Sequence, residues 1–218
     1  MIFISEERRT DNLLMRIMLE TIQNVVGENG LKSILNYAHL EKYIDNFPPD
    51  NDLLEVPAAD LHNARLSLIE LFGQRGTRGL ELRVGREMIR LFLKKRAGVT
   101  GILEVVGHLF PESKRMRIGL EKFMEQMEQR HPSPVIPRLE LQEKKDYFLL
   151  IDRDFLGSEG VASLEPVCNV YVGMLQHLME RATGHSHEVE EIECRAVGHP
   201  ADVFKITKAR KGRSSYRR

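Results

Sequence analysis

Apolar residues recur at steps of three and four positions along residues 11–130, a spacing that is typical of helices with one buried face. Glycine and proline interrupt the pattern: Gly27 follows the first apolar run, and Pro48 and Pro49 stop the second. Asp60 is expected to cap the third helix. The predicted helices cover residues 11–26, 31–40, 60–72, 79–96, 99–110 and 116–129.

The pattern changes after the proline-containing segment 131–137. One more helix is predicted over residues 165–182, with Pro166 and Cys168 in its first turn and Gly184 beyond its end. Short runs of alternating apolar and polar residues predict strands. These strands are expected at residues 138–142, 147–152, 189–197 and 202–207.

Together these elements predict an α+β fold, namely a helix-rich single domain with a small antiparallel sheet and a C-terminal β-hairpin. We expect one ligand-binding domain over residues 1–207, because the C-terminal sheet has too little surface to bury by itself. Its helical half would be residues 11–130 and its helix-plus-sheet half residues 137–207. The basic residues 208–218 are predicted to be a disordered tail.

The C-terminal hairpin is expected to place a thiol opposite a carboxylate. If Gly198 lies at the centre of the hairpin, Cys194 opposes Asp202 and Ile192 opposes Phe204. Directly opposed Cβ atoms lie about 4.5–5.5 Å apart, so both groups would reach one ion. Helix packing would bring Cys168 over the hairpin, and zinc accepts such sulfur and oxygen ligands. Alternatively, both cysteines are small buried apolar side chains, since they lack the close spacing of strong zinc motifs.

Four segments carry a resemblance to a known family: Glu165–Cys168, Gly173, Glu191–Gly198 and Asp202–Phe204. They resemble the 4-vinyl reductase domain family of hydrocarbon-binding domains. That family is related to the phenol-sensing modules of bacterial activators and shares a fold with the TRAPP vesicle-tethering subunits. The match covers about residues 137–207.

The resemblance implies a structural zinc site at Cys168, Glu191, Cys194 and Asp202. Asp202 departs from the family, which usually has cysteine there, and a site with fewer thiolates holds zinc less strongly. Glu191 lies three residues before Cys194, so on a regular strand it would point to the other face, and a bulge or strand end is needed to turn it. His199 in the predicted turn is an alternative ligand.

The resemblance also implies a pocket for an apolar or aromatic small molecule between the helices and the sheet. An alternative interpretation is that the same side chains simply form the core, because methionines at helical spacing are commonly packed inside. Tyr147 would offer a hydroxyl to a ligand or keep it at the surface. The candidate lining residues are Met88, Phe92, Met116, Phe123, Met127, Tyr147 and Phe148.

Composition narrows the cellular setting more than the chemistry. The 32 basic and 32 acidic residues cancel, so nucleic acid is not an expected partner except through the basic tail. No apolar run approaches the ~18 residues that cross a bilayer, and the charges near the N-terminus follow the apolar residues, unlike a secretory signal. Two cysteines indicate a reducing compartment, so a cytoplasmic protein is expected.

No arrangement of cysteine, serine and histidine suggests a nucleophile, and no nucleotide-cofactor motif supplies a hydride. We therefore favour a protein that binds a hydrocarbon, aromatic or tetrapyrrole-like molecule as a sensor, carrier or accessory of bacteriochlorophyll biosynthesis, acting through a partner or as a homodimer. The alternatives are an enzyme or subunit in tetrapyrrole vinyl reduction, and a ligand-free scaffold that makes protein contacts.

Overall fold

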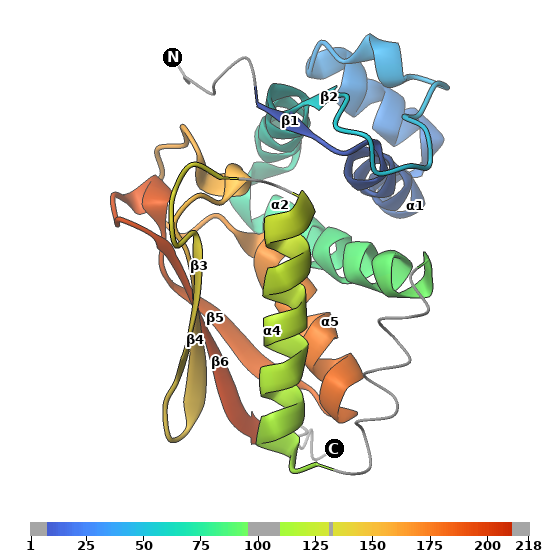
Figure 1. Cartoon of the computed structure of the whole chain (residues 1–218). Coiled ribbons are helices and arrows are strands. Elements are labelled where there is room, and N and C mark those ends of the chain that lie inside the picture. The colour runs from blue at the N-terminus through green and yellow to red at the C-terminus, as the bar shows by residue number, and fades with distance from the viewer. Residues whose placement is uncertain (1–7, 96–109, 131–132, 211–218) are drawn as a thin grey trace, which may run out of the picture.

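The computed structural model describes residues 8–95, 110–130 and 133–210. Within these ranges the chain has the predicted α+β fold, with helices packed around a four-stranded antiparallel sheet (Figure 1). The helix predicted at residues 99–110 lies outside the described residues apart from Phe110. Among the described helices, none is long and apolar enough to cross a membrane.

The two N-terminal helices are long and each is kinked at a glycine. Helix α1 spans Asn12–Tyr37 and α2 spans Ala58–Lys95, with non-helical backbone at Gly27 (φ 79°) and Gly73 (φ 68°). Glycine populates this left-handed region without the steric cost that other residues pay. The predicted gaps in the helices are therefore correct in position but too long, because each helix continues directly after its kink.

The N-termini of these helices differ in how well the sequence predicted them. Asp11 caps α1 and accepts the N–H of Leu14 at 2.8 Å. The predicted cap at Asp60 is wrong, since α2 begins at Ala58 and the Asp60 carboxylate instead accepts the Tyr43 hydroxyl at 2.5 Å. A short ribbon of β1 (Arg9–Thr10) and β2 (Val56–Pro57) ties the starts of the two helices together.

The sheet has the strand order β3-β4-β6-β5. Helices α4 and α5 cover one face of it (Figure 1), and their side chains share a core with Phe148, Leu150 and Phe204 of the sheet. The bounds are α4 Glu112–Arg130, β3 Leu139–Glu143, β4 Tyr147–Asp152, α5 Asn169–Thr183, β5 His187–Glu193 and β6 Asp202–Arg210.

Several C-terminal boundaries differ from the prediction. Helix α5 starts at Asn169 rather than residue 165, so Cys168 is its N-cap and not part of its first turn. Strand β5 ends at Glu193, and a short 3₁₀ turn, η3 (Arg195–Val197), replaces its predicted end. Strand β6 continues through Arg210, three residues further than predicted, into the segment expected to be disordered.

The helical part and the sheet part meet where α2 crosses α5. One buried cluster lies mainly between α1 and α2, and another lies between α4, α5 and the sheet, with Val170 of α5 touching both. Gly85 and Gly173 let the two helices approach closely. A Cβ atom on Gly85 would lie 2.0 Å from the carbonyl oxygen of Val170, and one on Gly173 would lie 2.2 Å from that of Leu82.

Candidate metal centre and apolar cavities

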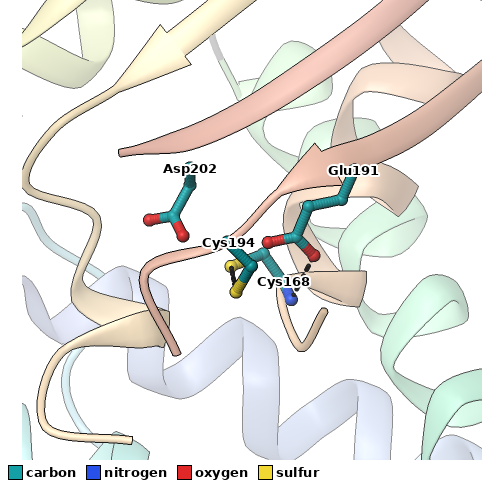
Figure 2. Close-up of side chains that lie close together, drawn as sticks. All are labelled: Cys168, Glu191, Cys194 and Asp202. Carbon is teal, nitrogen blue, oxygen red and sulfur yellow. Dashed lines mark hydrogen bonds between the residues drawn. The ribbon is translucent and has the colours of Figure 1, made fainter. Parts of the chain in front are cut away.

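The structure brings Cys168, Glu191, Cys194 and Asp202 together. One ligand atom from each lies within 4.8 Å of every other, and the two Sγ atoms are 4.0 Å apart. Figure 2 shows the side chains converging from the N-cap of α5, from β5, from the residue after β5 and from the start of β6. The three residues other than the partly buried Glu191 are buried.

A bulge in β5 makes this convergence possible. Glu191 pairs with Phe204 and Glu193 with Val203, so the register shifts between them and Ile192 is left without a partner in β6. The predicted opposition of Ile192 and Phe204 is therefore wrong, and Cys194 has left the strand before it reaches Asp202. The extra residue turns Glu191 and Cys194 to the same side, as the resemblance required.

Hydrogen bonds orient both carboxylates. The backbone N–H of Cys168 donates to Glu191 Oε2 at 2.8 Å, whereas buried Glu191 Oε1 has no partner among the described residues. Asp202 accepts the Ser158 hydroxyl at 2.6 Å and the backbone N–H of Arg195 at 2.8 Å, one on each oxygen. His199, the alternative ligand, is exposed and does not belong to the cluster.

These four groups fit a zinc ion. A Zn–S bond of about 2.3 Å places two sulfurs of a tetrahedral shell about 3.8 Å apart, close to the 4.0 Å between the two Sγ atoms. Burial raises the pKa of the Cys168 thiol well above its ordinary value, and it also raises the pKa of the Glu191 and Asp202 carboxyls. A cation would favour the ionised form of each group, and it would give the unpartnered Glu191 Oε1 a partner.

Two adjoining cavities lie where the helical part meets the sheet part. The first, here the α4 cavity, has a volume of about 70 Å³ and lies between α1, α2, α4 and α5. The second, here the η2 cavity, has a volume of about 120 Å³ and is lined by α1, α2, α5 and residues at the 3₁₀ turn η2 (Leu156–Ser158). Leu14, Met88 and Met174 line both cavities.

Only some of the predicted pocket residues line these cavities. Met88, Phe92, Phe123 and Met127 line the α4 cavity. Met116 and Phe148 are fully buried in the core beneath it. Tyr147 lies on the other face of β4, where the Lys205 ammonium sits 5.2 Å from the centre of its ring.

Sequence reasoning missed three polar residues of the η2 cavity, His62, Arg65 and Glu81. The available signal was their spacing: His62 and Arg65 directly follow Leu61 and Ala64, which lie on the predicted apolar face of the third helix. Polar side chains beside such a face are commonly exposed, but these are 5% and 8% exposed.

His62 is expected to make the protein less stable in mild acid. Burial first, and then the nearby Arg65 charge, lower its pKa from 6.5 to about 4. The unfolded chain therefore takes up a proton at His62 before the folded chain does. Stability is complete above pH 6.5 and falls as the pH drops towards 4, by about 2 kcal/mol between pH 7 and pH 5. Urea unfolding of the wild type and His62→Leu at both pH values measures this difference; equal losses in the two proteins would contradict it.

Comparisons with known proteins agree with the C-terminal part of this picture. Residues 149–208, which contain the whole metal-site candidate, match the family model of the 4-vinyl reductase domain. Among proteins whose functions have been curated, none matches the sequence significantly.

Solved structures with a similar fold extend over nearly the whole chain. A crystal structure of the Fe(II) unliganded H-NOX protein from K. algicida has a TM-score of 0.62 at 11% identity, covering 95% of this chain and 100% of that one. The IWP-051-bound H-NOX from Shewanella woodyi has a TM-score of 0.60 at 13% identity, covering 94% and 98%. At these identities the likeness establishes a shared fold.

Proposed function

The chain carries a 4-vinyl reductase domain in residues 149–208, and from that premise we propose that it binds an apolar small molecule and acts as a sensor. The shared fold supports this proposal, since the H-NOX protein from Shewanella woodyi was solved with the small molecule IWP-051 bound. Because the resemblance is to a family of hydrocarbon-binding domains, the proposed ligand class is an apolar or aromatic molecule.

The observation that carries the proposal is the pair of adjoining cavities at the junction of the two cores. Their walls are mostly leucine, methionine, valine and phenylalanine side chains. An engineered cavity of about 150 Å³ with similar walls binds benzene, so the combined space suits a single-ring ligand. Met88 and Met174 line both cavities, and their flexible side chains adapt to ligands of differing shape.

The position of the cavities suits a sensor. They lie between α1 and α2 on one side and α5 with its neighbours on the other. A ligand at this junction contacts both parts of the fold, so its binding energy depends on how the two parts are packed. Such differential contact is what allows a ligand to shift a protein between conformations.

A structural zinc ion is the second part of the proposal, held by Cys168, Glu191, Cys194 and Asp202. When bound, it supplies a cross-link between the start of α5 and the β5–β6 hairpin. With all four positions taken by protein ligands, this is the closed type of site that stabilises a fold. The chain's own residues then orient the carboxylates through Ser158 and the backbone N–H groups of Cys168 and Arg195.

Native mass spectrometry of the purified protein tests the binding proposal. We expect a mass above that of the polypeptide and any metal, released on denaturation as a small apolar molecule. The same spectrum gives the oligomeric state, for which the proposal is a homodimer.

A matched pair of variants links the retained mass to the cavities. Leu14→Trp fills a position shared by both cavities and is expected to abolish retention, whereas Leu54→Trp, at a residue 45% exposed and outside both cavities, should retain the ligand. Circular dichroism verifies that both variants fold. Equal retention by folded Leu14→Trp, or no ligand in any of the three proteins, would contradict the proposal.

A further inference from the structure

One end of the η2 cavity is polar, although the rest of its wall is apolar. His62, Arg65 and Glu81 line this end, and Leu14, Met18, Leu61, Leu68, Val84 and Met88 are among the apolar residues of the wall. All three polar residues are more than nine-tenths buried. Burying polar groups without partners costs free energy, so an arrangement of this kind calls for an occupant.

Arg65 is held in place by two of its nitrogens. Its Nε donates to Glu81 Oε1 at 2.5 Å and its Nη2 donates to the Val167 carbonyl at 2.8 Å. The remaining nitrogen, Nη1, is buried and has no partner among the described residues. A guanidinium group only donates hydrogen bonds, so a partner for Nη1 must be an acceptor.

His62 supplies a second unsatisfied nitrogen three residues earlier on the same helix. Its Nε2 is buried and has no hydrogen-bond partner within the described part of the chain. Residues three apart on a helix lie on one face, so both nitrogens border the same end of the cavity. Because His62 stays neutral at pH 7, its ring offers one N–H donor.

The charges at this end of the cavity are already balanced. The Arg65 cation is paired with Glu81, whose other oxygen accepts the Asn169 side-chain amide at 2.8 Å. A ligand carboxylate would leave one buried negative charge uncompensated, which is costly. A pure hydrocarbon would leave Arg65 Nη1 and His62 Nε2 unpaired. A carbonyl oxygen is neutral and has two lone pairs, one for each nitrogen.

We infer that the η2 cavity selects small apolar molecules that carry a carbonyl oxygen, with Arg65 Nη1 and His62 Nε2 as the two groups that bind it. This inference rests on the proposed function and specifies its ligand class. Selectivity follows because a site built to donate hydrogen bonds rejects an analogue that lacks the acceptor more strongly than an apolar wall does.

Three probes of nearly the same size separate the possibilities. Acetophenone carries the carbonyl, α-methylstyrene replaces its oxygen by a methylene group, and benzoate replaces the acetyl group by a carboxylate. Isothermal titration with the full chain at pH 7 is expected to give a Kd for acetophenone at least about tenfold lower than for either of the others, as the loss of a hydrogen bond to a charged donor predicts.

Variants assign the selectivity to the named residues. His62→Leu, and the charge-balanced double variant R65M/E81Q, are each expected to weaken acetophenone binding about tenfold and to leave α-methylstyrene binding within about twofold. Arg86→Met is the matched control, because this exposed arginine of α2 bonds to Gln176 and does not line the cavity. Circular dichroism verifies folding, and the two variants test the same carbonyl site by different changes.

Equal binding of acetophenone and α-methylstyrene, or tighter binding of benzoate, would overturn the inference and leave the proposed binding function intact. A carbonyl preference that survives in folded His62→Leu and R65M/E81Q would overturn the assignment to these residues. If none of the three probes binds and the purified protein retains no ligand, both the inference and the proposed function are wrong.

Discussion

Gly173→Ala is expected to lower the free energy of unfolding by about 3 kcal/mol or more, because the new methyl group has no room at the crossing of α2 and α5. Its Cβ would lie 2.2 Å from the carbonyl oxygen of Leu82 and 3.0 Å from the Leu82 Cα. These are backbone atoms, which cannot rotate away as the end of a side chain does. Gly85→Ala should be similarly damaging, since its Cβ would lie 2.0 Å from the carbonyl oxygen of Val170.

Gly79→Ala is the matched control for these two variants. Gly79 lies in α2, its φ is not positive, and a Cβ there meets nothing within 4 Å. Alanine should therefore stabilise the helix at this position by about 0.5–1 kcal/mol. Urea unfolding of the three variants measures the differences. If Gly173→Ala and Gly79→Ala have the same stability, the helices do not cross as closely as described.

The same crossing also shapes the η2 cavity. Val84 of α2 and Val170 and Met174 of α5 line it, and these residues neighbour Gly85 and Gly173 in the sequence. A methyl group that separates the helices therefore changes the cavity as well as the core. We expect any folded Gly173→Ala protein to bind α-methylstyrene differently from the wild type, whereas Gly79→Ala should leave that binding unchanged.

The sequence predicted elements whose pattern is local. Gly27, for example, ends a helical run because left-handed backbone suits glycine, and that preference is readable from one residue. The strands at residues 138–142 and 147–152 were found to within one residue of β3 and β4, since alternation of side chains is a property of each strand alone.

The bulge at Ile192 was beyond a prediction from spacing. A regular hairpin centred on Gly198 places Ile192 opposite Phe204, and one extra residue in β5 replaces that pair by Glu191 and Phe204. The resemblance to a family identified the four residues of the metal-site candidate, but only the packing of α5 on the hairpin brings Cys168 within 4.0 Å of Cys194.

The polar end of the η2 cavity was missed for a different reason. His62 and Arg65 have the composition of an exposed helix face, and their burial depends on α5 and on the residues near Leu156, which are far away in the sequence. Periodicity along one helix reports which side is apolar, but not which distant segment covers the positions beside it.

Zinc removal is expected to destabilise the wild-type protein by about 3 kcal/mol or more, because the metal-bound form is stabilised by the whole free energy of binding. The purified chain should contain about one zinc ion, measured by elemental analysis, and an excess of chelator should shift its urea midpoint downwards. Cys194→Ser should start from the lower stability and show no further shift with chelator. Glu190→Gln, an exposed neighbour on β5, should behave as the wild type does.

Chelator dependence distinguishes a metal site from an ordinary buried cysteine. Without a metal, Cys194→Ser would still lose packing in the core, but chelator would leave the wild type unchanged; that result would refute the metal site. Asp202→Cys provides the opposite change, since a third thiolate raises the affinity for zinc. Its readout is zinc affinity rather than stability, because the substitution also removes the carboxylate that accepts the Ser158 hydroxyl and the Arg195 N–H. Tighter zinc binding by Asp202→Cys, with loss of binding in Cys194→Ser, would place the ion among the four residues that the bulge brings together.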